Sequence, residues 1–180
     1  MTQSRFVIID RDGVINVDSE AYVKSPEEWT PIARSLEAIA LLTQAGWRIA
    51  VVTNQAGLSR GLFDLATLNR IHARMHEMVQ RRGGRIEAVF FCPHGPQDGC
   101  TCRKPKPGML LEAADRFDTD LSGQAFVGDS LRDLQAAQAA SMQPVLVRTG
   151  NGLRTLEQAS LIPEGTQVYD DLMDFAETLL

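Results

Sequence analysis

Short apolar runs alternate with longer amphipathic segments along this chain of 180 residues. The apolar runs are rich in β-branched residues and are typical of strands buried in a parallel sheet. The segments between them place apolar residues at helical spacing, and Asp64 is a candidate N-cap. The pattern predicts strands at 6–9, 48–53, 86–92, 124–128, 143–147 and 168–169, and helices at 35–45, 65–82, 107–117, 131–140 and 172–180.

The regular alternation of strand and helix predicts an α/β fold, a three-layer sandwich in which helices cover both faces of a mostly parallel sheet. Neither an internal repeat nor a linker interrupts residues 1–180, so we expect a single domain. Three segments are predicted to be loops. Residues 16–31 are polar and long enough to face a substrate, residues 56–63 contain two glycines, and residues 92–102 contain all three cysteines.

Composition limits the partners. Residues of the hydrophobic class make up 44% of the chain and charged residues 23%, as in soluble globular proteins. The net charge of −5 disfavours a nucleic-acid partner, since phosphate backbones are bound by basic surfaces. Because no apolar run is long enough to span a membrane and the first residues lack a signal-peptide core, we expect a cytoplasmic protein without membrane contact, and a monomer.

Polar residues follow several of the predicted strands. Asp10 and Asp12 come directly after the first strand, Thr53 closes the second, and Asp129 follows the fourth. The carboxyl ends of parallel strands meet at one edge, where open α/β sheets bind their ligands. Taken alone, an Asp-x-Asp-Gly stretch is more often a simple turn. Several functional residue types at one edge favour a site instead.

These residues match what hydrolysis of a phosphate monoester requires. Asp10 can attack phosphorus as a carboxylate nucleophile, and Asp12 can act as general acid and then as general base. Asp10, Asp129 and the backbone carbonyl of Asp12 offer the oxygen ligands that Mg²⁺ prefers. The Thr53 hydroxyl, the charge of Lys104 and the backbone amides of residues 54 and 55 can hold the phosphoryl oxygens.

Each assignment has a purely structural alternative. Thr53 can be a strand-end hydroxyl, Lys104 a solvated surface lysine, and Asp129 the N-cap of the next helix. Asp133, one turn later, can provide a favourable first-turn charge or can support the metal site. Only the combination of these residues favours an enzyme.

The segment from Cys92 to Cys102 carries a second signal. Cys92, His94, Cys100 and Cys102 together form a Cys₃His set, sufficient for a closed tetrahedral Zn²⁺ site. Because such a site has no open position, the metal would be structural. The alternatives are a reactive or redox thiol and three unpaired buried cysteines. Arg103 and Lys104 follow at once, so a rigid zinc loop would direct two cations towards a phosphate.

In this order, Asp10-Arg-Asp-Gly-Val, Val52-Thr-Asn, Lys104 and Gly128-Asp-Ser-Leu-Arg-Asp resemble the four motifs of the haloacid dehalogenase superfamily. The resemblance implies a Rossmann-like fold, a magnesium cofactor and an aspartyl-phosphate intermediate. It also implies an open cleft, because neither usual insertion site holds a large cap domain. Since Asp12 supplies the general acid that dehalogenases lack, the resemblance is to the phosphatases.

Cys-Pro-His followed by Cys-x-Cys-Arg-Lys-Pro-x-Pro-Gly-Met resembles one branch of that superfamily, which contains heptose bisphosphate phosphatases and histidinol phosphatases. With no fused dehydratase domain, the chain is closer to the heptose enzymes, which implies a sugar bisphosphate phosphatase of lipopolysaccharide-type heptose metabolism. Ser130 stands where some of these enzymes have lysine. The implied substrate contacts are Asp18, Tyr22, Asn54, Gln55, Arg60, Arg103 and Lys104, of which Arg103 and Lys104, with Thr53, are also assigned to catalysis.

Three alternatives stay open at this point. A histidinol-phosphate phosphatase would need acidic or aromatic groups for the imidazole, whereas Arg60 and Arg103 favour a second phosphate. A polynucleotide 3′-phosphatase shares the Thr-Asn-Gln stretch, but the acidic chain disfavours it. A zinc-stabilised binding module without catalysis is the alternative of another class.

Overall fold

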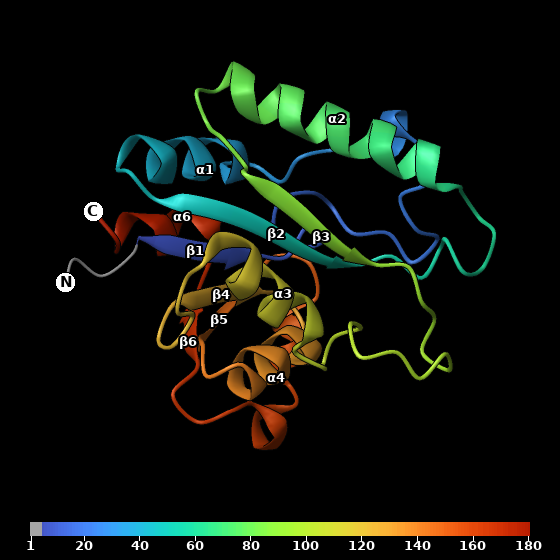
Figure 1. The fold of residues 1–180 in the computed structure, drawn as a ribbon. Helices are drawn as coiled ribbons and strands as arrows, with labels where there is room; N and C mark the ends of the chain where they lie inside the picture. Colours follow the sequence, from blue (N-terminus) through green and yellow to red (C-terminus); the bar gives the residue numbers. More distant parts are fainter. Residues whose placement is uncertain (1–4) are drawn as a thin grey trace.

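A computed structural model describes residues 5–180, which form one six-stranded sheet with helices on both faces (Figure 1). The strands are β1 (Phe6–Ile9), β2 (Arg48–Asn54), β3 (Ala88–Cys92), β4 (Ala125–Gly128), β5 (Gln143–Val147) and β6 (Gln167–Tyr169). The helices are α1 (Ser35–Gln44), α2 (Leu65–Arg81), α3 (Gly108–Phe117), α4 (Leu131–Ala139), α5 (Gly152–Leu156) and α6 (Leu172–Glu177), with 3-10 turns η1 (Pro26–Glu28) and η2 (Ala159–Leu161).

All strand pairs are parallel, in the order β3-β2-β1-β4-β5-β6. The chain winds outwards from β1 to β3, crosses to β4 and winds outwards in the other direction. Ile9 of β1 is in register with Val51 of β2 and Val127 of β4. β1 and β4 therefore flank the point where the strand order reverses, and the crevice at their carboxyl ends is where such sheets bind ligands.

The alternation of side chains along β1 divides the core into two layers. Val7 and Ile9 pack in the layer that contains α1, α2 and α6, whereas Phe6 and Ile8 pack in the layer that contains α3 and α4. All four side chains are fully buried. Because both faces are covered, the first strand tolerates charge only beyond Ile9, which is where the aspartates begin.

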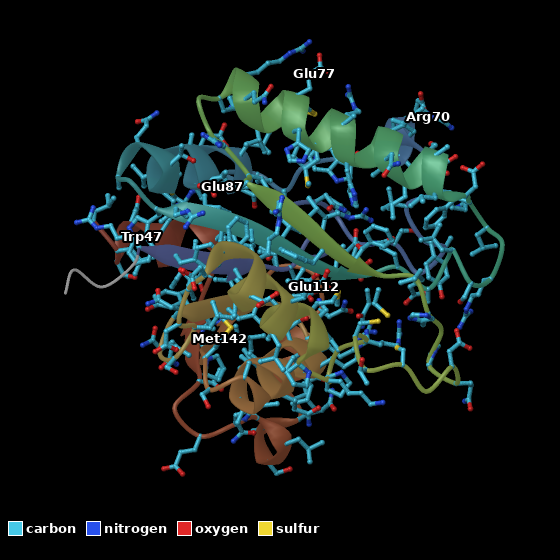
Figure 2. All side chains as sticks on the ribbon, viewed as in Figure 1. Trp47, Arg70, Glu77, Glu87, Glu112 and Met142 are labelled. Atoms are coloured by element: carbon cyan, nitrogen blue, oxygen red, sulfur yellow. The ribbon has the colours of Figure 1, made fainter. Side chains whose placement is uncertain are left out.

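Helix α2 shows how the amphipathic pattern positions a functional side chain. Its N-cap is Asp64, whose Oδ1 accepts a hydrogen bond from the Thr67 amide at 2.8 Å, as predicted. Arg70 and Glu77 project from its outer surface (Figure 2). The opposite face is buried and carries His72 inwards together with the apolar residues.

The sequence pattern predicted the strands and the longer helices but not the shortest helical segments. Helix α3 begins at Gly108 with Pro107 as its N-cap rather than inside it, and β3 begins two residues later than expected. The pattern did not predict η1, α5 or η2, which are too short to show periodicity. The segment at 16–31 is a loop with one 3-10 turn packed against α2, not a separate cap domain.

No helix within residues 5–180 is long and apolar enough to cross a membrane.

Candidate active site

A cavity of about 250 Å³ lies at the carboxyl edge of the sheet, beside the ends of β1, β2 and β4. Its walls come from these strand ends, from the loop after β1 and from the segment after the cysteines. The predicted site residues that line it are Asp10, Asp12, Asp18, Tyr22, Thr53, Asn54, Gln55, Arg103, Lys104 and Asp129. The parallel sheet therefore brings residues from distant parts of the sequence into one place.

Lys104 joins two buried carboxylates at the centre of this site. Its Nζ lies 2.9 Å from Oδ1 of Asp10 and 2.7 Å from Oδ1 of Asp133, and it also donates to the carbonyl of Val52 at 3.2 Å. Burial disfavours the charge of Lys104, but the two carboxylates outweigh it and raise its pKa. Lys104 is 3% exposed, so the alternative of a solvated surface lysine is wrong.

Asn54 fixes the backbone at Lys104. Its Oδ1 accepts from the Lys104 amide at 3.0 Å and its Nδ2 donates to the Lys104 carbonyl at 3.2 Å. The end of β2 is thus tied to the segment that follows the cysteines. The side chain of Asn54, which the sequence assigned to the substrate, thus positions the backbone of Lys104.

Asp133 has the first-turn role that the sequence left open, and it also pairs with Lys104. Its Oδ2 accepts from the Ser130 amide at 3.0 Å and from the Ser130 hydroxyl at 2.8 Å, which closes the first turn of α4. Its Oδ1 pairs with Lys104. Burial acts to raise its pKa, but Lys104 and the Ser130 hydrogen bonds outweigh that effect and lower it. Both the amide and the hydroxyl of Ser130 therefore donate to Asp133.

Asp129 is packed between two glycines. Its Oδ2 accepts from the Asn151 amide at 2.7 Å and from Asn151 Nδ2 at 3.2 Å. Gly13 and Gly150 both have positive φ, and a Cβ on either would collide with the Asp129 carboxylate. Burial, and then the charge of Asp133, raise the pKa of Asp129 to about 7.

The carboxylates of Asp10, Asp129 and Asp133 form a group whose ligand oxygens lie within 4.8 Å of one another. Lys104 supplies one positive charge to these three carboxylates, through its ion pairs with Asp10 and Asp133. The hydrogen bonds to Asp129 come from Asn151, which is neutral. Burial and the neighbouring carboxylates raise the pKa of Asp10 well above its ordinary value despite Lys104. Such an excess of buried negative charge, presented as carboxylate oxygens, fits a divalent cation such as Mg²⁺.

Asp12 lies outside this group and is held by neutral donors and a guanidinium. Arg11 Nη2 donates to its Oδ1 at 2.9 Å, Asn16 Nδ2 donates to the same oxygen at 2.9 Å, and Gln55 Nε2 donates to its Oδ2 at 3.1 Å. Burial acts to raise the pKa of Asp12, but Arg11 and these hydrogen bonds outweigh it and lower it. The carboxylate form of Asp12 is therefore favoured.

The donors expected from the end of β2 are only partly placed as predicted. Thr53 is buried at the cavity, and its Oγ1 accepts from Gln55 Nε2 at 2.9 Å. The backbone amide of Gln55 donates to the Cys92 carbonyl at 2.8 Å, because the parallel pairing of β2 with β3 continues past the strand end. That amide has a partner in the sheet and is not a free donor for a phosphoryl oxygen.

The predicted sugar contacts differ in whether they line the cavity. Asp18 lines the cavity and accepts from Asn151 Nδ2 at 3.0 Å, and Tyr22 lines it as well. Arg60 does not line this cavity; its guanidinium stacks 5.5 Å from the centre of the Tyr22 ring. Arg103 lines the cavity and donates to the His94 carbonyl at 3.3 Å.

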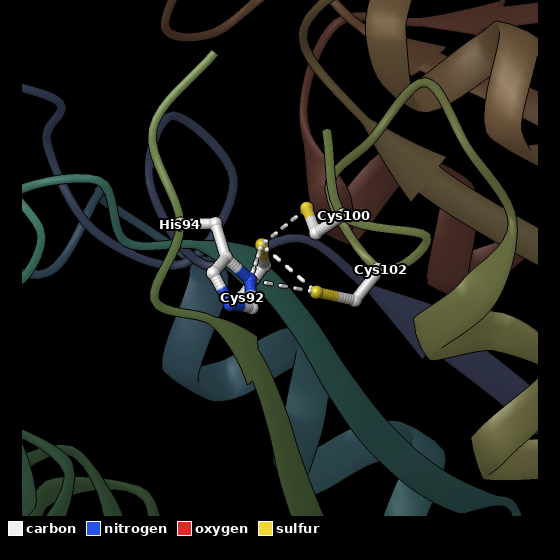
Figure 3. A group of neighbouring side chains, drawn as sticks. All are labelled: Cys92, His94, Cys100 and Cys102. Carbon is white, nitrogen blue, oxygen red and sulfur yellow. Dashed lines mark hydrogen bonds between the residues drawn. The ribbon is translucent and has the colours of Figure 1, made fainter. Parts of the chain in front are cut away.

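The three cysteines and His94 converge as one cluster (Figure 3). Cys92 Sγ lies 3.1 Å from Cys102 Sγ and 3.7 Å from Cys100 Sγ, and His94 Nδ1 lies 3.3 Å from Cys102 Sγ. Ligands about 2.3 Å from a tetrahedral zinc are about 3.7 Å apart, so the cluster is close to that geometry. The sulfur separations are well beyond the roughly 2.0 Å of a disulfide.

Sequence reasoning gave no role to Asn151 or Arg132, both of which line the cavity. Asn151 belongs to a Gly-Asn-Gly turn just after β5, and this turn at a strand end was the signal that could have identified it. Arg11 was quoted in the first motif without a function, yet its side chain is fully buried against Asp12.

Comparison with known proteins agrees with this arrangement. A family model described as HAD-hydrolase-like matches residues 101–175. A D-glycero-β-D-manno-heptose-1,7-bisphosphate 7-phosphatase from Bordetella bronchiseptica is 58% identical, with 98% of each chain covered. The same enzyme from Pseudomonas aeruginosa is 56% identical, with 97% of each chain covered. This chain belongs to the heptose bisphosphate phosphatase family of the haloacid dehalogenase superfamily.

A solved member of the heptose bisphosphate phosphatase family has nearly the same fold. The crystal structure of the Bordetella bronchiseptica D,D-heptose 1,7-bisphosphate phosphatase, complexed with magnesium and phosphate, superposes with a TM-score of 0.95 at 58% identity over 97% of each chain. The α/β fold and the superfamily inferred from the sequence motifs are thereby confirmed.

Proposed function

We propose that this chain is a magnesium-dependent phosphatase that removes the 7-phosphate of D-glycero-D-manno-heptose 1,7-bisphosphate, in the synthesis of activated heptose for lipopolysaccharide or a related glycan. The family membership supports the substrate, and the buried Asp10–Lys104–Asp133 arrangement beside Asp12 and Asp129 supports the chemistry. The one observation that carries the proposal is the buried group of Asp10, Asp129 and Asp133, suited to Mg²⁺, with Lys104 paired to Asp10 and with Asp12 lining the same cavity.

Asp10 is the proposed nucleophile. The Arg11 amide and Lys104 Nζ both contact its Oδ1, at 2.7 and 2.9 Å, so Oδ2 is the oxygen left for attack. As the Oδ2–P bond forms, the bond between phosphorus and the sugar oxygen breaks, and the leaving oxygen takes a proton from Asp12. A phosphate dianion beside Asp12 raises its pKa, which supplies the acid form needed at this step.

Asp12 then acts as a base. It accepts a proton from a water molecule whose oxygen attacks phosphorus, and the Oδ2–P bond breaks to release phosphate and restore Asp10. Arg11, Asn16 and Gln55 favour the ionised form of Asp12 that this second step uses. The Thr53 hydroxyl and Lys104 are proposed to hold the phosphoryl oxygens.

Asp10 and Asp129, with the Asp12 backbone carbonyl, would hold the Mg²⁺. When bound, the metal neutralises charge between the carboxylates and the phosphate and so permits the approach of two anions. Lys104 and Asp133 keep Asp10 in place beside it.

We propose that Cys92, His94, Cys100 and Cys102 bind a structural Zn²⁺. All four corners come from the protein, which leaves no open position for substrate. The metal would fix the loop that carries Arg103, whose guanidinium is already bound to the carbonyl of His94 within it. The single domain, the monomeric state and the cytoplasmic location remain predictions from the sequence.

The test is phosphate release from heptose 1,7-bisphosphate by purified protein in Mg²⁺, beside histidinol phosphate at equal concentration. We expect a clear preference for the sugar and loss of turnover in Asp10→Asn. Asp115→Asn on the exposed surface of α3 changes the charge equally and should keep full activity. Full activity of Asp10→Asn would refute the nucleophile, and preference for histidinol phosphate would refute the substrate.

A further inference from the structure

The turn after β5 and the helix α5 that follows it hold Asp129 at its backbone and at its side chain. The Thr155 hydroxyl donates to the Asp129 carbonyl at 2.8 Å, and the Asn151 backbone amide donates to Asp129 Oδ2 at 2.7 Å. Gly150 allows this close approach, because a Cβ at that position would collide with the Asp129 carboxylate. The turn is therefore built around the residue proposed as a magnesium ligand.

The side chain of Asn151 joins Asp129 to a second carboxylate. Its Nδ2 donates to Asp129 Oδ2 at 3.2 Å and to Asp18 Oδ2 at 3.0 Å. An amide nitrogen carries two hydrogens, so both are given to carboxylates. Within residues 5–180, both hydrogen bonds from Asn151 to the Asp129 carboxylate go to Oδ2 and none reaches Oδ1, which leaves Oδ1 for a cation.

Asp18 lies in a stretch that has little other support. Residues 17–21 are all exposed. Among the described residues, the hydrogen bonds of residues 18–22 have their partners within the loop at 16–31, except for the one from Asn151. The Arg60 guanidinium also stacks on the Tyr22 ring. The place of Asp18 at the cavity therefore depends on Asn151.

We propose that Asn151 is a positioning residue that couples the magnesium site to the substrate loop. It holds Oδ2 of Asp129, so that Oδ1 stays available to the cation, and it holds Asp18 at the cavity with its other N–H. The inference rests on the proposed function, since it requires Mg²⁺ at Asp129 and a substrate beside Asp18. Hydrogen bonds that orient metal ligands commonly contribute 10- to 100-fold to metal affinity.

Asn151→Ala tests the coupling, because it removes both side-chain donors and keeps the backbone amide. We expect the Mg²⁺ concentration that gives half of the metal-dependent rise in Tm to increase about tenfold, without substrate present. KM for heptose 1,7-bisphosphate should rise as well. Asn151→Gln retains an amide and should recover part of both losses. Asn69→Ala on the exposed surface of α2 is the matched control and should keep the wild-type values.

Asp18→Ala separates the two contacts of Asn151. It removes the link to the loop and leaves Asn151 bound to Asp129, so the Mg²⁺ dependence of Tm should stay that of the wild type. KM should rise in this variant. In the double variant Asn151→Ala should raise KM little further, because the contact that both residues share is already lost. Tm measured with a chelator verifies that each variant is folded.

The outcomes separate this inference from the proposed function. A wild-type Mg²⁺ dependence of Tm in Asn151→Ala would overturn the coupling and leave the proposed function intact. Additive effects of Asn151→Ala and Asp18→Ala on KM would do the same. If Mg²⁺ does not stabilise the wild-type protein, the magnesium site of the proposed function fails, and the role of Asn151 fails with it.

Discussion

Nη1 of Arg11 lies 3.1 Å from Nε2 of His72, deep beneath the first catalytic motif. Burial and the charge of Arg11 lower the pKa of His72 to about 3, so this imidazole is neutral and Nε2 accepts from the guanidinium. The same guanidinium donates to Asp12. α2 therefore supplies an uncharged acceptor that orients Arg11 towards the proposed acid–base residue.

His72→Leu removes that acceptor, and we expect it to slow turnover by roughly 10- to 100-fold through a displaced Asp12. The loss should be greater for an alkyl phosphate, whose leaving oxygen needs a proton, than for p-nitrophenyl phosphate. His72→Gln, which retains an acceptor, should recover most of the rate. Equal losses on both substrates would indicate a structural role for His72 without an effect on proton transfer.

The low pKa of His72 also predicts how stability depends on pH. An unfolded chain binds the proton near pH 6.5, whereas the folded protein binds it only near pH 3. The free energy of unfolding should consequently fall as the pH drops from 6.5 towards 3, by up to about 1.4 kcal/mol per pH unit from this group. Urea unfolding at several pH values, compared between wild type and His72→Gln, measures the contribution.

His76 on the same helix is the matched control, since it is less buried and its pKa is lowered by burial without a guanidinium partner. His76→Gln should change the pH dependence less than His72→Gln. A wild-type slope that persists in His72→Gln would show that other groups produce the effect.

Which site residues could be predicted from the sequence depends on the structural element that carries each of them. Asp10 and Asp129 directly follow strands, and Thr53 is the last residue but one of β2, so a predicted parallel sheet was enough to bring the three together. Asn151 lines the cavity from the turn after β5, and Arg132 lines it from the exposed surface of α4. The spacing of apolar residues does not predict towards which site a polar side chain in a turn or on a helix surface points. Arg11 and Lys104 are charged side chains of types that are mostly exposed, and their complete burial depends on tertiary partners.

Gly13 tests how closely the backbone must approach Asp129. Its φ is 81°, and an added Cβ would meet the Asp129 carboxylate. Gly13→Ala should therefore weaken Mg²⁺ activation at least tenfold and lower stability, beyond the roughly 1–2 kcal/mol of a left-handed non-glycine residue. Gly165→Ala is the control, because φ is 80° there and no atom lies within 4 Å of the added Cβ. Equal effects of the two substitutions would refute a specific contact with Asp129.

The zinc proposal predicts one zinc per chain and a measurable dependence of stability on it. Cys100→Ala removes one of four ligands, so elemental analysis should find the metal largely lost. We expect Tm to fall by at least about 5 °C, since about 1 kcal/mol shifts Tm by about 2–4 °C in a domain of this size. Activity should fall as well, because Arg103 is held by His94 in the same loop. Thr101→Ala, between two ligand cysteines, retains the complete ligand set and should retain zinc, Tm and activity. Absence of zinc from wild-type protein prepared without chelators would leave the cluster as free thiols and refute the structural metal.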